Sequence, residues 1–117
     1  MTFHTDTSTG KKLGVAELIG RLDAKNSSEL ITSFALWQQQ TSLFVFDCTR
    51  LDFIDSSGLG TIVSCLRKAI EHNGDVKLAN LSRKVSMVFE ITKAKKLFSI
   101  FPDTGSALHS YESNVSE

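Results

Sequence analysis

The segment Asp55-Ser56-Ser57-Gly58 places a carboxylate, two hydroxyls and a glycine in consecutive positions. It interrupts an apolar stretch, which resumes after it at helical spacing. Side chains of this kind suit four chemistries: a serine nucleophile, a glycine-rich phosphate cradle, a helix N-cap, or a serine that accepts a phosphoryl group. Each chemistry has its own sequence requirement, and two of the four requirements are not met.

A serine nucleophile is disfavoured by the residues around both serines. The nucleophile elbow of serine hydrolases reads G-x-S-x-G. Ile54 stands two residues before Ser56, and Asp55 stands two residues before Ser57, so the pattern fails for either serine. The chain has three histidines, none with an orienting carboxylate motif beside it: His4, His72 and His109. We therefore expect no enzymatic activity.

A nucleotide cradle is also disfavoured. Gly58-Leu59-Gly60 begins like a dinucleotide fingerprint, but Val63 occupies the position of the third glycine. No lysine followed by serine or threonine comes after these glycines, as a phosphate-binding loop would require. The sequence also shows no cluster of metal ligands. We therefore expect neither a cofactor nor a metal.

The two remaining interpretations stay open from the residues alone. Aspartate, serine and glycine are favoured at helix starts, so Ser56 or Ser57 can be an N-cap and nothing more. Alternatively, one serine accepts a phosphoryl group. The electropositive start of a helix tolerates phosphate, although Asp55 beside it opposes this by like-charge repulsion. A phosphoserine adds about −1.5 to −2 charges, which would repel acidic groups of a docked partner without changing the fold.

Bulk composition bounds the class of protein. The 117 residues, 41% of them hydrophobic and 22% charged, suit one domain spanning residues 1–117. The charges of 13 basic and 13 acidic residues cancel, and a net charge of zero disfavours direct nucleic-acid binding. The lysines of Thr92–Lys96 are interpreted as a solvated face. Cys48 and Cys65 form no metal or disulfide pattern and are expected to be small buried hydrophobes. No apolar run approaches the ~18 residues of a membrane span, and no signal layout opens the chain. We expect a cytoplasmic protein that does not enter a membrane.

The strands and helices that must position the segment alternate along the chain. Strands are expected at residues 13–20, 42–48, 75–80 and 97–101, while the first 12 residues either form an edge strand or stay loose. Residues 49–53 are expected to be a connection. Such alternation implies right-handed crossovers and a mostly parallel sheet. The loops that follow parallel strands gather at one end of the sheet, and Asp55–Gly58 lies in such a loop.

Four helices are expected between these strands. The first begins at Asn26, with Glu29 completing a capping box, or at Ser27. The second runs from about Ser57 to His72, with an apolar face lined by Leu59, Ile62, Val63, Leu66 and Ile70. The third opens at Ser82 and turns Val85, Val88, Phe89 and Ile91 largely inward. The fourth is short and capped by Asp103 or Thr104.

Three segments resemble the STAS domain family, specifically its bacterial anti-sigma-factor antagonists. They are GRLDAKNSSEL (20–30), FVFDCTRLDFIDSSGLGTIVSCLRKA (44–69) and VKLANLSRKVSMVFEITKAKKLFSIF (76–101). The D-S-S-G-L core and the separate G-x-L-D turn at residues 20–23 carry the resemblance, which covers about residues 11–112. It implies a single α/β domain with a central, mostly parallel four- to five-stranded sheet. About four helices would pack mainly on one face.

The resemblance also implies partner switching. The unphosphorylated antagonist would bind an anti-sigma factor that is also a serine kinase, and so free a sigma factor. Phosphorylation would release the antagonist, and a serine phosphatase would restore it. The implied phosphoacceptor is Ser56, with Ser57 as the alternative. The implied partner surface consists of Asp23, Asp55, Ser56, Ser57, Gly58 and Leu59.

One position departs from the family pattern, and the family has other roles. Arg21 stands where relatives often have an acidic residue, so partner contacts are expected to differ there. Other STAS proteins are scaffolds of stress-sensing complexes or accompany lipid transporters. Those that form tails of anion transporters are disfavoured, because this chain shows no membrane segment. A scaffold or signalling role away from any sigma factor is therefore the alternative function.

Overall fold

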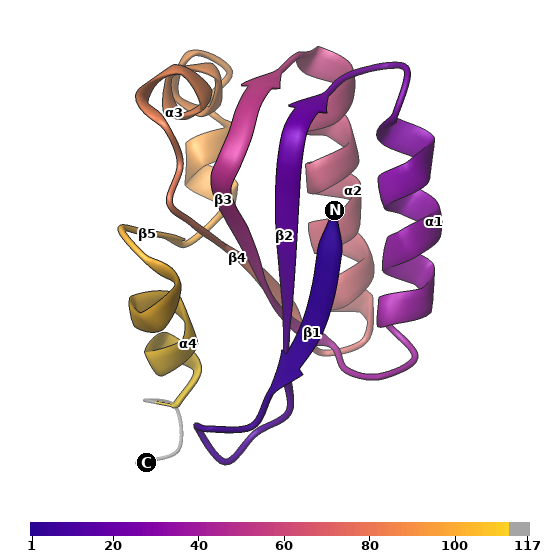
Figure 1. Ribbon diagram of the computed structural model, residues 1–117, viewed down its shortest axis with the longest axis vertical. Coiled ribbons are helices and arrows are strands. Elements are labelled where there is room, and N and C mark those ends of the chain that lie inside the picture. The colour runs from indigo at the N-terminus through magenta and orange to yellow at the C-terminus, as the bar shows by residue number, and fades with distance from the viewer. Residues whose placement is uncertain (113–117) are drawn as a thin grey trace.

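The computed structural model describes residues 1–112, whose elements are shown in Figure 1. In chain order they are β1 (Thr2–Asp6), β2 (Leu13–Leu22), α1 (Ser27–Trp37), β3 (Leu43–Ile54), α2 (Ser56–Glu71), β4 (Asp75–Ala79), α3 (Arg83–Ile91), the 3₁₀ helix η1 (Ala94–Leu97), β5 (Ile100–Phe101) and α4 (Thr104–Glu112). The remaining residues of the expected domain, 113–117, lie outside the described part.

The five strands form one sheet in the order β1-β2-β3-β4-β5. β1 runs antiparallel to β2, and the three other pairs are parallel, which confirms the expected mostly parallel sheet. The first residues form an edge strand, the first of the two alternatives that the sequence allowed. The ring of Phe3 stacks on Trp37 at a centroid distance of 4.8 Å and holds this edge against α1.

The helices lie mainly on one face of the sheet, as expected. α1, α2 and α3 cover a core that includes Phe34, Phe46, Ile62 and Phe89. α1 and α2 lie side by side, while α4 lies on the opposite side of the sheet (Figure 1). A smaller cluster anchors α4 there: Leu13, Val45, Ala79, Ala107 and Tyr111.

Two expected strand boundaries were wrong. Residues 49–53 are not a connection but part of β3, which runs to Ile54 beside the end of β2 and pairs Ile54 with Leu22. Leu51 and Ile54 are buried, but burial does not alternate strictly here, because the register with β2 shifts between the pairs Gly20–Leu51 and Arg21–Phe53. The last strand is shorter than expected, because η1 takes residues 94–97 and leaves only Ile100–Phe101 to pair with β4.

Helix faces differ from expectation at two isoleucines. Ile70 of α2 is 56% exposed and Ile91 of α3 is 74% exposed, whereas both were expected to face inward. In α2 the small Ala69 faces the sheet instead, and Ile70 falls at the margin of the buried stripe. Ile91 is the last residue of α3, beyond Phe89, which is fully buried.

Helix caps confirm two expectations and correct one. Ser82 caps α3 by accepting a hydrogen bond from the Val85 N–H at 3.1 Å. Asp103, one of the two residues proposed for α4, accepts from the Ser106 N–H at 2.7 Å. The capping box at α1 does not form: the side chain of Asn26 accepts from the Asp23 N–H at 2.8 Å and so closes the preceding loop.

Candidate functional site

The corner between β3 and α2 is organised by Asp55. Ile54 is buried at the end of β3, and Asp55 follows in an extended conformation. The Asp55 carboxylate accepts a hydrogen bond from the Gly58 N–H at 2.9 Å, which is the contact of an N-cap. The cap of α2 is therefore the aspartate, and the interpretation of Ser56 or Ser57 as the cap is wrong.

Both serines face solvent at the first turn of α2. Within residues 1–112 no hydrogen bond engages the hydroxyl of Ser56 or of Ser57; the Thr61 hydroxyl donates to the backbone carbonyl of Ser57 at 3.0 Å. A group attached to either hydroxyl would therefore break none of the bonds that hold the corner. This is the geometry that a modifiable serine requires.

Gly58 and Leu59 support the corner from beneath. A Cβ on residue 58 would lie 2.2 Å from the carbonyl oxygen of Leu22, so only glycine lets the start of α2 approach the end of β2. The Asp55 N–H donates to the same carbonyl at 3.3 Å. Leu59 is only 7% exposed. Both residues hold the corner in place and present little surface to solvent themselves.

Asp23 lies in the loop that follows Leu22, beside this corner. Its carboxylate accepts from the Lys25 N–H at 3.0 Å and from Nε of Arg21 at 3.3 Å. Desolvation opposes ionisation, but these hydrogen bonds and the Arg21 charge outweigh it and lower the pKa of Asp23. Asp23 thus carries a fixed negative charge that is engaged within its own loop and not with either serine. The Arg21 guanidinium also lies 4.1 Å from the centre of the Phe53 ring.

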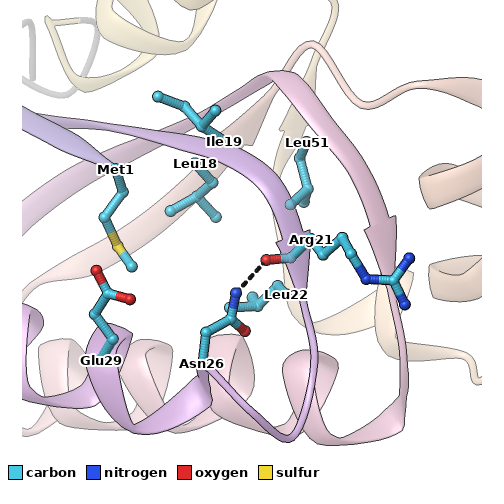
Figure 2. A pocket seen from close by; sticks show the side chains of 8 residues that line it. All are labelled: Met1, Leu18, Ile19, Arg21, Leu22, Asn26, Glu29 and Leu51. Carbon is cyan, nitrogen blue, oxygen red and sulfur yellow. Dashed lines mark hydrogen bonds between the residues drawn. The ribbon is translucent and has the colours of Figure 1, made fainter.

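A recess opens on the other side of this loop, between the end of β2 and the start of α1. Figure 2 shows its lining, with the Asn26 side-chain amide donating to the Arg21 carbonyl. Its volume is about 60 Å³, well below the roughly 300 Å³ or more of pockets that hold small organic ligands. The recess is therefore too small to be the main functional site.

A shallow groove leads away from Ser56 along α2, and sequence reasoning missed it. One wall is a helical stripe of α2, and the other is the junction of α3 and η1. The lining residues are Ser56, Leu59, Gly60, Val63 and Arg67 from α2, with Thr92, Lys93, Ala94 and Leu97 opposite. Ser57 is not among them. The available signal was the lysine-rich segment Thr92–Lys96, which was interpreted only as a solvated face.

The described residues show no metal site and no membrane helix. Residues 1–112 contain no group of three or more histidine, cysteine, aspartate or glutamate side chains placed to hold a metal ion. No helix in this part of the chain is long and apolar enough to cross a bilayer. The chemistry of the site therefore rests on the corner, its serines and the adjoining groove.

The fold is a mixed α/β domain with one mostly parallel five-stranded sheet, and its candidate site is the serine-bearing corner before α2. The family model of the STAS domain matches residues 5–107, and the chain belongs to this family. This confirms the resemblance noted in the sequence.

Individual relatives agree with this assignment. The anti-sigma-B factor antagonist of Staphylococcus aureus is 24% identical over 101 residues, which cover 86% of this chain and 94% of that protein. The anti-sigma factor antagonist SpoIIAA in its unphosphorylated form superposes with a TM-score of 0.75 at 22% identity, covering 96% and 97% of the two chains. The phosphorylated form of this Bacillus protein gives 0.68 at 21% identity, covering 94% and 99%.

The fold alone does not separate the roles found in the family. The STAS domain of a SulP transporter from Vibrio cholerae also superposes, with a TM-score of 0.67 at 14% identity, covering 86% of this chain and 83% of that one. A functional conclusion for this chain must therefore rest on the corner and its serines.

Proposed function

We propose that this chain is a cytoplasmic anti-sigma-factor antagonist that works by partner switching. Its unphosphorylated form binds an anti-sigma factor with serine kinase activity, which then releases a sigma factor. One observation at the corner carries the proposal. Asp55 caps α2, and the exposed Ser56 hydroxyl makes no hydrogen bond that holds the fold within the described residues.

Ser56 is the proposed phosphoacceptor, and the groove favours it over Ser57. Ser56 lines the groove beside α2, whereas Ser57 does not. The Ser56 Oγ attacks the γ-phosphorus of ATP held by the kinase, the bond from that phosphorus to the β–γ bridging oxygen breaks, and ADP leaves. The hydroxyl proton passes to a base of the kinase. A metal-dependent serine phosphatase reverses the state by hydrolysing the phosphate ester, which restores the Ser56 hydroxyl and releases inorganic phosphate.

Phosphorylation switches binding by electrostatics and not by unfolding. The phosphate brings about −1.5 to −2 charges to a surface that already carries the Asp55 and Asp23 carboxylates. Burying this charge against a partner costs desolvation, and acidic groups of the partner are repelled. Because the corner's hydrogen bonds do not use the serine hydroxyl, the free domain keeps its structure.

The similar proteins support this role. The S. aureus relative is named as an anti-sigma-B factor antagonist, and SpoIIAA is an anti-sigma factor antagonist known in both unphosphorylated and phosphorylated forms. In this chain the segment that resembles the family's phosphorylation motif folds into an exposed corner, as such a switch requires.

A paired pull-down tests the proposal. Ser56→Ala and Ser56→Asp are used as baits in lysate from the native cell, with mass spectrometry as the readout. We expect a kinase-like anti-sigma factor to bind the alanine variant and not the aspartate variant. Ser57→Ala and Ser57→Asp serve as matched controls one residue away. Capture of the same protein by both Ser56 baits would contradict the proposal and favour a scaffold role.

A further inference from the structure

The groove beside Ser56 is lined by two cationic side chains, Arg67 and Lys93. Ser56, Gly60, Val63 and Arg67 follow one another at helical spacing on α2, and Lys93 faces this stripe from the end of α3. No acidic residue lines the groove. Acidic residues near the lining residues in sequence include Asp55, whose carboxylate accepts from the Gly58 N–H, Glu71, four residues after Arg67, and Glu90, which pairs with Lys95.

Lys93 has an uncommon backbone conformation. Its φ of 64° and ψ of 10° lie in the left-handed region, directly after the last turn of α3. Glycine or asparagine usually occupies this position after a helix, because a larger side chain is disfavoured there. The structure thus places a lysine where glycine would be less strained, and the lysine lines the same groove as Ser56.

The ammonium of Lys93 is also uncommitted. Lys95 pairs with Glu90 at 3.7 Å, but among the described residues no ion pair or hydrogen bond engages Nζ of Lys93 or the guanidinium of Arg67. Gly60 adds no side chain to the groove between these cations and Ser56, and a Cβ on Gly60 would meet nothing within 4 Å. The groove therefore has space and positive charge but no anion within the described residues.

We propose that Lys93 is the counter-charge for a phosphate on Ser56, so that the phosphorylated serine is held in the chain's own groove. This inference rests on the proposed phosphorylation of Ser56. Arg67 lies three helical turns from Ser56 and contributes to the potential without touching the phosphate. A phosphate held in this way lies over Gly60, and phosphorylation then closes the groove to a partner in addition to repelling it.

A phosphorus NMR titration tests this inference on the protein alone. Phosphoserine is incorporated at position 56 during translation, and the second phosphate pKa is measured in the parent chain, K93Q, R67Q and K95Q. We expect the K93Q value to lie about half a pH unit above the parent value. Coulomb's law gives this magnitude in water if the proposed contact brings the ammonium to about 6 Å from the phosphate charge. R67Q and K95Q should raise the phosphate pKa by less. The Asp55 carboxylate raises this pKa by like-charge repulsion, but it is present in all four proteins and so does not affect the comparison.

An equal phosphate pKa in the parent and K93Q proteins would overturn the inference. So would a larger shift in K95Q than in K93Q, which would indicate a diffuse field instead of a counter-charge. K93G is the second variant, because it relieves the left-handed strain and keeps the domain folded; it should raise the phosphate pKa as K93Q does. No partner takes part in the titration, so its outcome is independent of the pull-down that tests the proposed function.

Discussion

Gly58 lies against the backbone of Leu22, close enough that a Cβ on residue 58 would stand 2.2 Å from the Leu22 carbonyl oxygen. This contact joins the first turn of α2 to the end of β2. It places the loop that carries Asp23 beside the corner that carries Ser56. The glycine of the D-S-S-G segment therefore allows the backbones of α2 and β2 to come close together, because it has no Cβ. The two serines are exposed at the surface.

Gly58→Ala is expected to destabilise the domain. Alanine normally stabilises a helix relative to glycine by up to about 1 kcal/mol, but here the added methyl group would meet backbone that has little freedom to move. We expect the free energy of unfolding to fall by roughly 1–3 kcal/mol, the usual cost of overpacking. Urea denaturation followed by circular dichroism measures the change.

Gly60→Ala is the matched control in the same helix. A Cβ at this exposed position meets nothing within 4 Å, so only the helix propensity changes. The free energy of unfolding should rise by about 0.5–1 kcal/mol. Equal effects of the two alanines, in either direction, would contradict the packing described for Gly58.

Asp55→Ala removes the cap of α2. The Gly58 N–H then loses its acceptor, and the free energy of unfolding should fall by about 1 kcal/mol. Ser56→Ala and Ser57→Ala should stay within about 0.5 kcal/mol of the parent, since neither hydroxyl bonds within the described residues. A larger loss in either serine variant than in Asp55→Ala would assign the cap to that serine.

The sequence predicted the order of most elements and the position of the serine corner, because apolar periodicity and turn residues act locally. It did not predict which residue caps α2, since Asp55, Ser56 and Ser57 are all good caps and the choice depends on how β3 enters the corner. The length of β3 was missed because its polar end, residues 49–53, becomes a strand only by pairing with β2. The groove was missed because it joins α2 to Lys93, and their proximity follows from tertiary packing.

Asp47 should make stability depend on pH. Burial acts to raise its pKa, but hydrogen bonds from the Thr49 hydroxyl at 2.6 Å and the Asn80 amide at 3.0 Å outweigh burial, so the pKa lies below its ordinary value. Because the pKa of Asp47 is lower in the folded state, its ionised carboxylate stabilises the fold at pH values above its unfolded-state pKa of about 3.9. This stabilisation is lost as the pH falls through the folded-state pKa.

Asp47→Asn is therefore expected to lower the free energy of unfolding at neutral pH by up to about 1 kcal/mol, because the carboxylate is only partly buried and solvent screens its interactions. The difference from the parent should shrink at acidic pH, as the pH falls below the unfolded-state value of about 3.9 and through the lower folded-state pKa at which Asp47 becomes protonated. Urea denaturation at neutral and acidic pH measures it. An undiminished difference in acid would mean that the charge of Asp47 is not what stabilises this contact.

The two cysteines should be unreactive in the folded chain. Burial raises the pKa of both Cys48 and Cys65 to about 12, and both side chains are nearly inaccessible. Almost no thiolate exists at pH 8, so a disulfide-exchange reagent should modify neither thiol until denaturant is added. Rapid modification of either thiol in the native protein would show that the core opens locally.

The most direct test of the central claim is the dissociation constant of the captured partner, measured by calorimetry with unmodified chain and with chain carrying phosphoserine at position 56. The account predicts at least tenfold weaker binding after phosphorylation, about 1.4 kcal/mol or more, with the free energy of unfolding unchanged within about 0.5 kcal/mol. Equal affinity of the two forms, with the fold intact, would contradict a switch at Ser56.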